Sequence, residues 1–490
     1  MTGGLWAAER RALTAGLVAT ITFVAAEALA VATVMPLVAR DLHGLGLYGF
    51  VFSAFLLGTM IGIVAAGRAA DRHGPAVPYV AGIGVFAAGL TIAGLAPSMP
   101  VLVAGRTLQG LGAGAVQSIA YVAIGRSLPD ELRAKMMAVL STAWVAPGLA
   151  GPALSAEVAR LFGWRWVFLG LLPFIAVTGP VAIPALARLG RPAPPAADGH
   201  RLIDGIGVAA AAGMFLAGLT LAIGSGGTGA ASGPAVSTAS SGTGSLAGGI
   251  CLAVAGGALG LAVLRRLMPA GTLTARYGLP ATMVMRSLLT FAFFGADAFV
   301  TLTITILRHR SPVVAGIAVT GTTLGWTAGS WIQARMNSRW AGRRLIRIGL
   351  TVILTGIAGL GLLLSARVTV AEGIAAWTVA GLGMGICNAP TTLLMLKLAP
   401  QGGEGWAAAS LNLADVLGSA IGIGLGGAAI TAAVSLRWPL SAGIGVAFAL
   451  AAAAAAGALL VSRRLPVAVG SAELVRAAAS PARNAASPAN

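Results

Sequence analysis

The chain has 490 residues, of which 57% are hydrophobic and only 9% are charged, and its mean hydropathy is +0.89. Soluble globular proteins average about 25% charged residues, so this composition excludes a soluble protein and indicates a helical membrane protein. The formal net charge of +18 does not indicate a nucleic-acid partner, because the basic residues lie between apolar runs, where they set membrane topology.

Fourteen apolar runs are long enough to span a bilayer as helices. They lie near residues 14–38, 48–70, 76–96, 101–123, 136–159, 164–187, 204–224, 246–268, 280–306, 312–334, 345–366, 369–396, 406–434 and 441–462. With the N-terminus in the cytoplasm, the inner loops hold 23 Lys and Arg residues, the outer loops hold 7, and two lie within runs. This asymmetry follows the positive-inside rule and predicts that both termini are cytoplasmic.

The first six and the last six runs are related by a nearly constant shift of 264 to 277 residues. A parallel repeat of this kind predicts two six-helix halves, residues 1–187 and 269–462. Residues 188–268 then form a linker and two inserted helices, and residues 463–490 are expected to be a disordered cytoplasmic tail. The expected fold class is an all-α membrane protein with 14 transmembrane helices.

The first run contains Glu27, the only charged residue between Ala15 and Leu37. A carboxylate at the centre of a bilayer costs at least about 2.5–3.5 kcal/mol, so it is rarely kept for stability. Glu27 therefore predicts a proton or substrate site.

The loop after the second run reads Gly67-Arg-Ala-Ala-Asp71-Arg72-His-Gly74. It resembles the Gly-x-x-x-Asp-Arg-x-Gly loop of the major facilitator superfamily, which latches the two halves of the protein in one state. We expect Gly67 and Gly74 to permit a tight turn, and Asp71 to pair with the adjacent helix end and with Arg72. The basic residue that follows the last glycine in the family is replaced by Pro-Ala at 75–76, so the full charge relay is not expected.

The fourth run carries Arg106-Thr-Leu-Gln109-Gly110-Leu-Gly112-Ala-Gly114. This is similar to the Arg-x-x-Gln-Gly motif of the same family, whose arginine is implicated in proton transfer. Its glycines predict a closely packed helix face. The alternative is that Arg106, near the outer end of the run, extends to the membrane interface.

The fifth run carries Pro147-Gly148-x-x-Gly151-Pro152, which resembles the Gly-Pro motif of antiporters in this superfamily and predicts a kinked, tightly packed helix. The match is partial, because Ser-Ala at 155–156 replaces the terminal Gly-Gly. Glu27 lies nine residues before Pro36, the spacing at which the fourteen-span drug:proton antiporter group has an aspartate. The sequence Trp-Arg-Trp-Val-Phe at 164–168 is also similar to that group.

This resemblance implies a major facilitator fold and a secondary active transporter that exports small amphiphilic compounds or drugs by alternating access, coupled to protons. It implies a monomer in the bacterial cytoplasmic membrane that crosses the bilayer many times and contacts its lipids, with the proton gradient as driving force and no cofactor. A transporter of the same fold for a lipid or an endogenous metabolite, not necessarily coupled to protons, is the alternative.

The second half has its own buried acids, Asp297 and Asp415. Asp297 lies one turn from position 293, which corresponds to Glu27 by the 266-residue shift. Either acid can pair with Arg286, but Asp297 is eleven residues away on the same helix, about 16 Å, which is too far. For both acids a role in coupling or substrate binding competes with a simple packing hydrogen bond.

Two asparagines of the second half are candidates for the substrate path. Asn388 precedes Pro390, which is expected to break its helix, and Asn412 lies three residues before Asp415 on the same helical face. Trp326, Trp331 and Trp377 are candidates for contacting an aromatic substrate, and anchoring at the membrane interface is the alternative.

Other functional classes find little support in the sequence. It has no Gly-x-x-x-x-Gly-Lys-Ser/Thr loop, which an ATP-driven pump needs. Its four histidines are scattered, so we expect no catalytic cluster, no metal site and no enzymatic activity.

Overall fold

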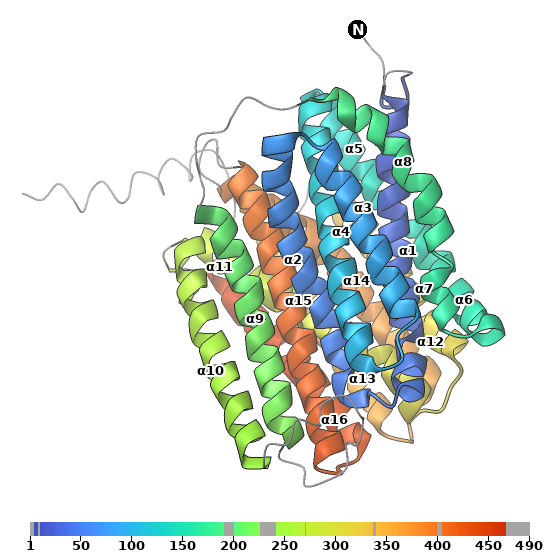
Figure 1. The fold of residues 1–490 in the computed structure, drawn as a ribbon. Coiled ribbons are helices and arrows are strands. Elements are labelled where there is room, and N and C mark those ends of the chain that lie inside the picture. The colour runs from blue at the N-terminus through green and yellow to red at the C-terminus, as the bar shows by residue number, and fades with distance from the viewer. Residues whose placement is uncertain are drawn as a thin grey trace, which may run out of the picture.

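The computed structural model describes residues 4–7, 10–190, 200–225, 242–269, 271–336, 340–398 and 404–466, and every regular element in these ranges is a helix (Figure 1). The first part comprises α1 (Arg11–Asp41), η1 (Leu45–Leu47), α2 (Tyr48–His73), α3 (Ala76–Gly94), α4 (Met99–Ser127), α5 (Asp130–Thr142), α6 (Val145–Phe162), α7 (Arg165–Leu169) and α8 (Leu172–Arg188). The inserted helices are α9 (His200–Ser225) and α10 (Gly242–Leu267). The last part comprises α11 (Leu279–Leu302), η2 (Thr303–Leu307), α12 (Pro312–Met336), α13 (Gly342–Gly361), η3 (Leu362–Leu364), α14 (Val370–Leu398), α15 (Glu404–Ser435), α16 (Leu440–Val461) and η4 (Ser462–Arg464).

Eleven helical segments of the described residues are long and apolar enough to cross a membrane. The predicted runs at 101–123, 136–159 and 312–334 are helical as well, but they lie outside these eleven segments. The predicted tail at 463–490 lies almost entirely outside the described residues.

Prolines explain where the helices differ from the predicted runs. The run at 136–159 is divided between α5 and α6, and the run at 164–187 between α7 and α8. Pro147 and Pro173 lie in the first turns of α6 and α8, where a residue without an N–H costs little, so a new helix begins there.

The predicted helix break at Pro390 is wrong, because α14 continues through it. The hydroxyl of Thr391 donates to the Cys387 carbonyl at 2.6 Å, and the hydroxyl of Thr392 donates to the Asn388 carbonyl at 3.1 Å. These carbonyls neighbour that of Ile386, which Pro390 leaves without its helical donor, and membrane helices tolerate proline where nearby side chains support the backbone.

The two parts repeat one packing pattern. Helix α4 packs against both α2 and α3, and in the same way α14 packs against both α12 and α13. The inserted α9 and α10 pack on each other at one edge of the bundle, and α9 also contacts α2 and α15 (Figure 1). The inserted pair therefore covers a seam between the two parts.

The two parts meet closely at the end of the molecule that carries the α1–α2 and α11–α12 turns, which we call the turn end. Five hydrogen bonds between described residues join them there. The Tyr48 hydroxyl donates to the Ala298 carbonyl at 2.9 Å, and the Ser53 hydroxyl donates to the Ala420 carbonyl at 2.9 Å. Gly49 and Gly427 bring the backbones of α2 and α15 into direct contact, so that a Cβ at either position would overlap the other chain segment.

Candidate functional site

Helix α1 places Glu27 against Arg106 of α4, and both side chains are buried. Arg106 Nη1 donates to Glu27 Oε1 and, at 2.7 Å, to Gln109 Oε1. The guanidinium also lies over the ring of Phe55 on α2, 4.2 Å from its centroid. We call these four residues the Glu27 cluster. Arg106 therefore points into the protein and not toward the membrane interface.

The Glu27 cluster holds polar atoms that its own contacts do not satisfy. Glu27 Oε2, Arg106 Nε and Gln109 Nε2 are buried without a hydrogen-bond partner, and they are the only such side-chain atoms in the described ranges. An unpaired buried polar group costs about 1–3 kcal/mol, and a buried ion pair is weak evidence for stability. The contacts within the cluster are therefore expected to add little to the stability of the fold.

Glycines let α4 come close enough to place Arg106. Gly110 and Gly114 face the Phe55 and Thr59 carbonyls of α2, and Gly112 faces α3. A side chain at any of these positions would overlap the neighbouring backbone, so the close packing expected from the motif is present.

We expect Gly110→Ala to destabilise the protein by about 1–3 kcal/mol, because the added methyl group overpacks the α2–α4 contact. The matched control is Gly84→Ala on α3, where a Cβ meets no atom within 4 Å. Thermal unfolding of the purified variants checks the prediction. An equal melting temperature for the two variants would show that the α2–α4 contact does not require glycine.

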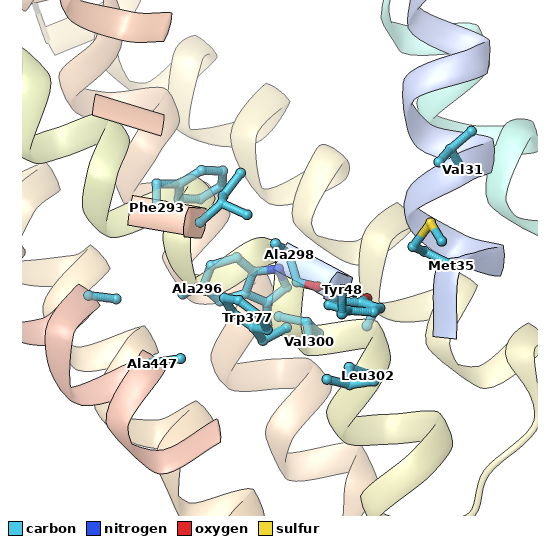
Figure 2. Close-up of a cluster of buried hydrophobic side chains, with 14 of the residues drawn as sticks. Val31, Met35, Tyr48, Phe293, Ala296, Ala298, Val300, Leu302, Trp377 and Ala447 are labelled. Carbon is cyan, nitrogen blue, oxygen red and sulfur yellow. Dashed lines mark hydrogen bonds between the residues drawn. The ribbon is translucent and has the colours of Figure 1, made fainter. Parts of the chain in front are cut away.

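Asp297 lies on α11 beside a group of aromatic rings. Its Oδ1 accepts a hydrogen bond from Trp377 Nε1 of α14 at 3.1 Å. Trp377 stacks on Phe293 with centroids 5.2 Å apart, and Tyr48 from the first part packs nearby (Figure 2). We call Phe293, Phe294, Asp297, Trp326 and Trp377 the Asp297 cluster. It adjoins the contact between the two parts at the turn end, because Tyr48 donates to the carbonyl of the next residue, Ala298.

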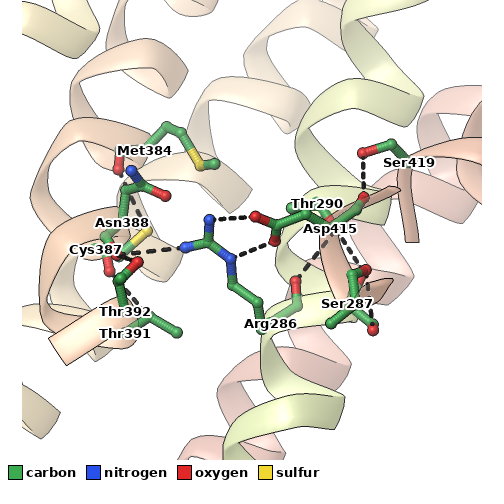
Figure 3. A network of polar contacts seen from close by, with 11 residues as sticks. Arg286, Ser287, Thr290, Met384, Cys387, Asn388, Thr391, Thr392, Asp415 and Ser419 are labelled. Atoms are coloured by element: carbon green, nitrogen blue, oxygen red, sulfur yellow. Dashed lines mark hydrogen bonds and ion pairs between the residues drawn. The ribbon is translucent and has the colours of Figure 1, made fainter. Parts of the chain in front are cut away.

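Asp415 of α15 and Arg286 of α11 form a second ion pair (Figure 3). Arg286 Nε donates to Asp415 Oδ1, and Nη2 donates to Oδ2 at 2.7 Å. Arg286 Nη1 also donates to the Asn388 carbonyl of α14 at 3.3 Å. The guanidinium therefore joins three helices of the last part. Asn412 lies half-buried one turn before Asp415.

The structure thus places the four predicted coupling residues in three separate clusters. Glu27 is paired with Arg106, Asp415 with Arg286, and Asp297 with the neutral Trp377. The sequence left open whether Arg286 pairs with Asp415, and it did not predict the Glu27–Arg106 pair at all.

The loop at 67–74 differs in part from its prediction. Helix α2 continues to His73, so Gly67 lies inside the helix and does not form the turn. Gly74 forms it, with φ of +80°, a backbone conformation that favours glycine. Asp71 accepts a hydrogen bond from Arg126 Nη2 at the end of α4, at 3.2 Å, and not from Arg72.

The fifth-run motif contributes to the seam between α6 and α12. Gly148 faces Thr323, and Pro152 lies against Gly316. Gly151 was expected to pack in the same way, but this is wrong, because a Cβ there meets nothing within 4 Å. It instead lines an apolar groove of about 870 Å³ between α1, α6 and the α7–α8 segment.

Comparisons with known proteins agree with this architecture. The sequence matches the family model described as Major Facilitator Superfamily over residues 15–310. It is 27% identical over 421 residues to a probable multidrug-efflux transporter of Mycobacterium tuberculosis, covering 82% of this chain and 83% of that protein. It is also 31% identical over 180 residues to the multidrug transporter protein MdtP of Bacillus subtilis, covering 37% and 32% of the two chains.

Solved structures show the same fold. A POT family peptide transporter superimposes with a TM-score of 0.63 at 15% identity, covering 92% of this chain and 97% of that one. A D-xylose-proton symporter superimposes with a TM-score of 0.62 at 14% identity, covering 93% and 98%. With the family model matched over more than half of its length, the chain belongs to the major facilitator superfamily.

Proposed function

We propose that the chain is a secondary active transporter that exports drugs or other small amphiphilic compounds across the bacterial cytoplasmic membrane in exchange for protons. Membership of the superfamily and the two relatives named as multidrug transporters support export of this kind. The observation that carries proton coupling is the Glu27 cluster, a buried acid whose second oxygen has no partner.

The proposal includes fourteen transmembrane spans and a monomer with both termini in the cytoplasm. Fourteen spans require that α4, the α5–α6 pair and α12 cross the bilayer in addition to the eleven apolar segments. The excess of Lys and Arg in the inner loops supports this orientation. The turn end is then extracytoplasmic, and the conformation is closed on the outer side.

Glu27 and Arg106 can couple a proton to the conformation of the first half. A proton on Glu27 removes the charge that balances Arg106 and leaves the guanidinium with Gln109 and Phe55 as its neighbours. An uncompensated buried cation favours a conformation in which water or substrate reaches it. Rocking of the two halves about their interface then exposes the site alternately to each side of the membrane.

The test uses full-length protein in liposomes with an imposed pH gradient. A fluorescent lipophilic dye should move against its concentration gradient while protons move the opposite way, and a protonophore, which collapses the pH gradient, should stop the uphill movement of the dye. Dye movement that is unaffected by collapse of the gradient would contradict proton coupling.

A second candidate, transport of a lipid or an apolar metabolite, is favoured by the groove between α1, α6 and the α7–α8 segment. Its walls include Leu154 and Phe174, which are 63% and 64% exposed on the surface that would face lipid. A deletion strain distinguishes the candidates: drug export predicts increased susceptibility to toxic compounds, and lipid transport predicts a changed envelope lipid profile at normal susceptibility.

A further inference from the structure

Asp297 differs from Glu27 and Asp415 because no basic residue of the described ranges balances its charge. Glu27 and Asp415 each form an ion pair with an arginine of their own half. Within the described part of the chain, Asp297 has no ion pair, and its one hydrogen bond comes from the neutral indole of Trp377. A half-buried carboxylate inside a membrane protein is costly without a cation, so this site is suited to receiving a positive charge from outside the chain.

The internal repeat indicates what kind of cation could balance Asp297. Arg106 is the seventh residue after the first residue of α4, and Trp377 is the seventh after the first residue of α14, so Trp377 occupies the place of Arg106. Asp297 lies within one turn of the position on α11 that corresponds to Glu27 on α1. The first half thus fills its acid site with its own guanidinium, whereas the second half has a tryptophan in that place.

The acid sites of the two halves also both contain aromatic rings. In the first half the Arg106 guanidinium lies over Phe55 of α2. In the second half α12 corresponds to α2, and the Thr322 carbonyl faces Gly381 as the Phe55 carbonyl faces Gly110. Helix α12 supplies Trp326 four residues after Thr322, one turn beyond the equivalent position. Both sites are therefore made by the same three helices of their halves, with one acid and at least one ring.

The rings of the Asp297 cluster lie within reach of one another and of the carboxylate. Phe293 and Phe294 precede Asp297 by four and three residues and so share its face of α11. Phe293 contacts Trp326 edge-on, with centroids 5.5 Å apart, whereas Phe294 and Trp326 are 6.4 Å apart and tilted by 47°. Asp297, Phe294 and Trp326 are half-buried, so the protein leaves part of each residue's surface uncovered.

We propose that the Asp297 cluster is a binding site for an organic cation, held between the carboxylate and the rings as the Arg106 guanidinium is held in the first half. The ring faces attract a cation through their quadrupoles, and the apolar surroundings favour a cation whose charge is delocalised or shielded by hydrocarbon. A small, strongly hydrated ammonium is a poor ligand here, because the site offers one carboxylate in place of its water shell. This inference rests on the proposed transport function and assigns a charge class to its cargo.

The test measures equilibrium binding to full-length protein in nanodiscs, without any gradient. The probes are tetraphenylphosphonium, a cation, and triphenylphosphine oxide, a neutral compound with similar rings. We expect Asp297→Asn to weaken binding of the cation roughly tenfold or more while changing binding of the neutral compound less than about twofold. Asp297→Glu, which keeps the charge, should retain most of the affinity for the cation.

Two tryptophans of α12 provide a matched pair for the aromatic part of the site. Trp326→Leu should weaken cation binding, whereas Trp331→Leu should leave it unchanged, because Trp331 is 66% exposed on the outside of the bundle. Trp326→Leu also keeps the proposal testable if Asp297→Asn fails to fold.

Unchanged cation binding in Asp297→Asn, or equal losses for the cation and the neutral compound, would overturn the proposal. Because binding is measured without a gradient, its failure would leave proton-driven export untouched. Loss of gradient-driven dye transport in the wild-type protein would instead contradict the proposed function.

Discussion

Glu27→Gln is expected to abolish proton-driven transport and also to destabilise the protein. Gln has nearly the shape of Glu and can still accept a hydrogen bond from Arg106, but it cannot exchange a proton. It also leaves Arg106 as a buried charge without a counter-charge, a change that costs about 3–5 kcal/mol in buried pairs. Proton and dye fluxes in liposomes and thermal unfolding of the same preparation measure the two effects.

A double variant separates the two effects. Glu27→Gln combined with Arg106→Gln removes both charges, so it should regain most of the lost stability and still show no coupling. Glu27→Asp, which keeps the exchangeable proton, should retain measurable coupling. Full proton-coupled transport in the stable double variant would exclude the Glu27 cluster as the coupling site.

Asp415→Leu is expected to reduce stability by about 3 kcal/mol, because it leaves the 6%-exposed Arg286 without its counter-charge. The pair joins α11 to α15, and Arg286 also holds the Asn388 carbonyl of α14. Replacing both partners, as Arg286→Met with Asp415→Leu, should restore the melting temperature to near the wild-type value, since apolar residues of similar volume often replace buried ion pairs without loss.

Transport by the same double variant decides the role of Asp415. If the pair only connects helices, the double variant exports dye at close to the wild-type rate. Loss of transport at wild-type stability would instead place Asp415 in the coupling or substrate path. A melting temperature that remains low in the double variant would show that the unpaired charge of Arg286 is not what destabilises Asp415→Leu.

Helix positions were predictable from the sequence because a bilayer imposes a fixed length on each apolar run. The same reasoning could not locate the interruptions at Pro147 and Pro173, where the chain stays apolar while the helix restarts. It also could not tell that Pro390 stays helical, because the packing of α14 against α12 and α13 and the contact of Arg286 with the Asn388 carbonyl come from other helices.

The Glu27–Arg106 pair could not be predicted from the depth of each residue in the membrane. Glu27 lies 14 residues before the end of α1, and Arg106 lies seven residues after the start of α4, which corresponds to a difference in depth of about 10 Å. From sequence the two residues therefore fall in different layers of the membrane. Their long side chains bridge the gap, with Arg106 held on a helix that its glycines pack against α2 and α3.

The remaining site residues depended on contacts between distant helices. The similarity of the Arg106 motif to the family drew attention to Arg106, but only the structure gives Trp377 as its counterpart in the second half. The predicted runs begin at 101 and 369, so they place Arg106 five and Trp377 eight residues from the start, and the correspondence becomes exact only with the structural starts of α4 and α14. Exposed Trp331 carries no such correspondence and lies on the outside of the bundle.

Both buried arginines have their counter-charges within their own half, Arg106 with Glu27 and Arg286 with Asp415. When the halves rock against each other, neither ion pair has to be separated, and each pair moves as an electrically neutral unit. The two pairs then contribute little gating charge, and once a proton or a cationic cargo balances Asp297, that acid contributes little as well. The sensitivity of the cycle to membrane voltage is set by the protons and the cargo, so exchange of one proton for a monovalent cation would be electrically silent, whereas exchange for a neutral compound would carry current.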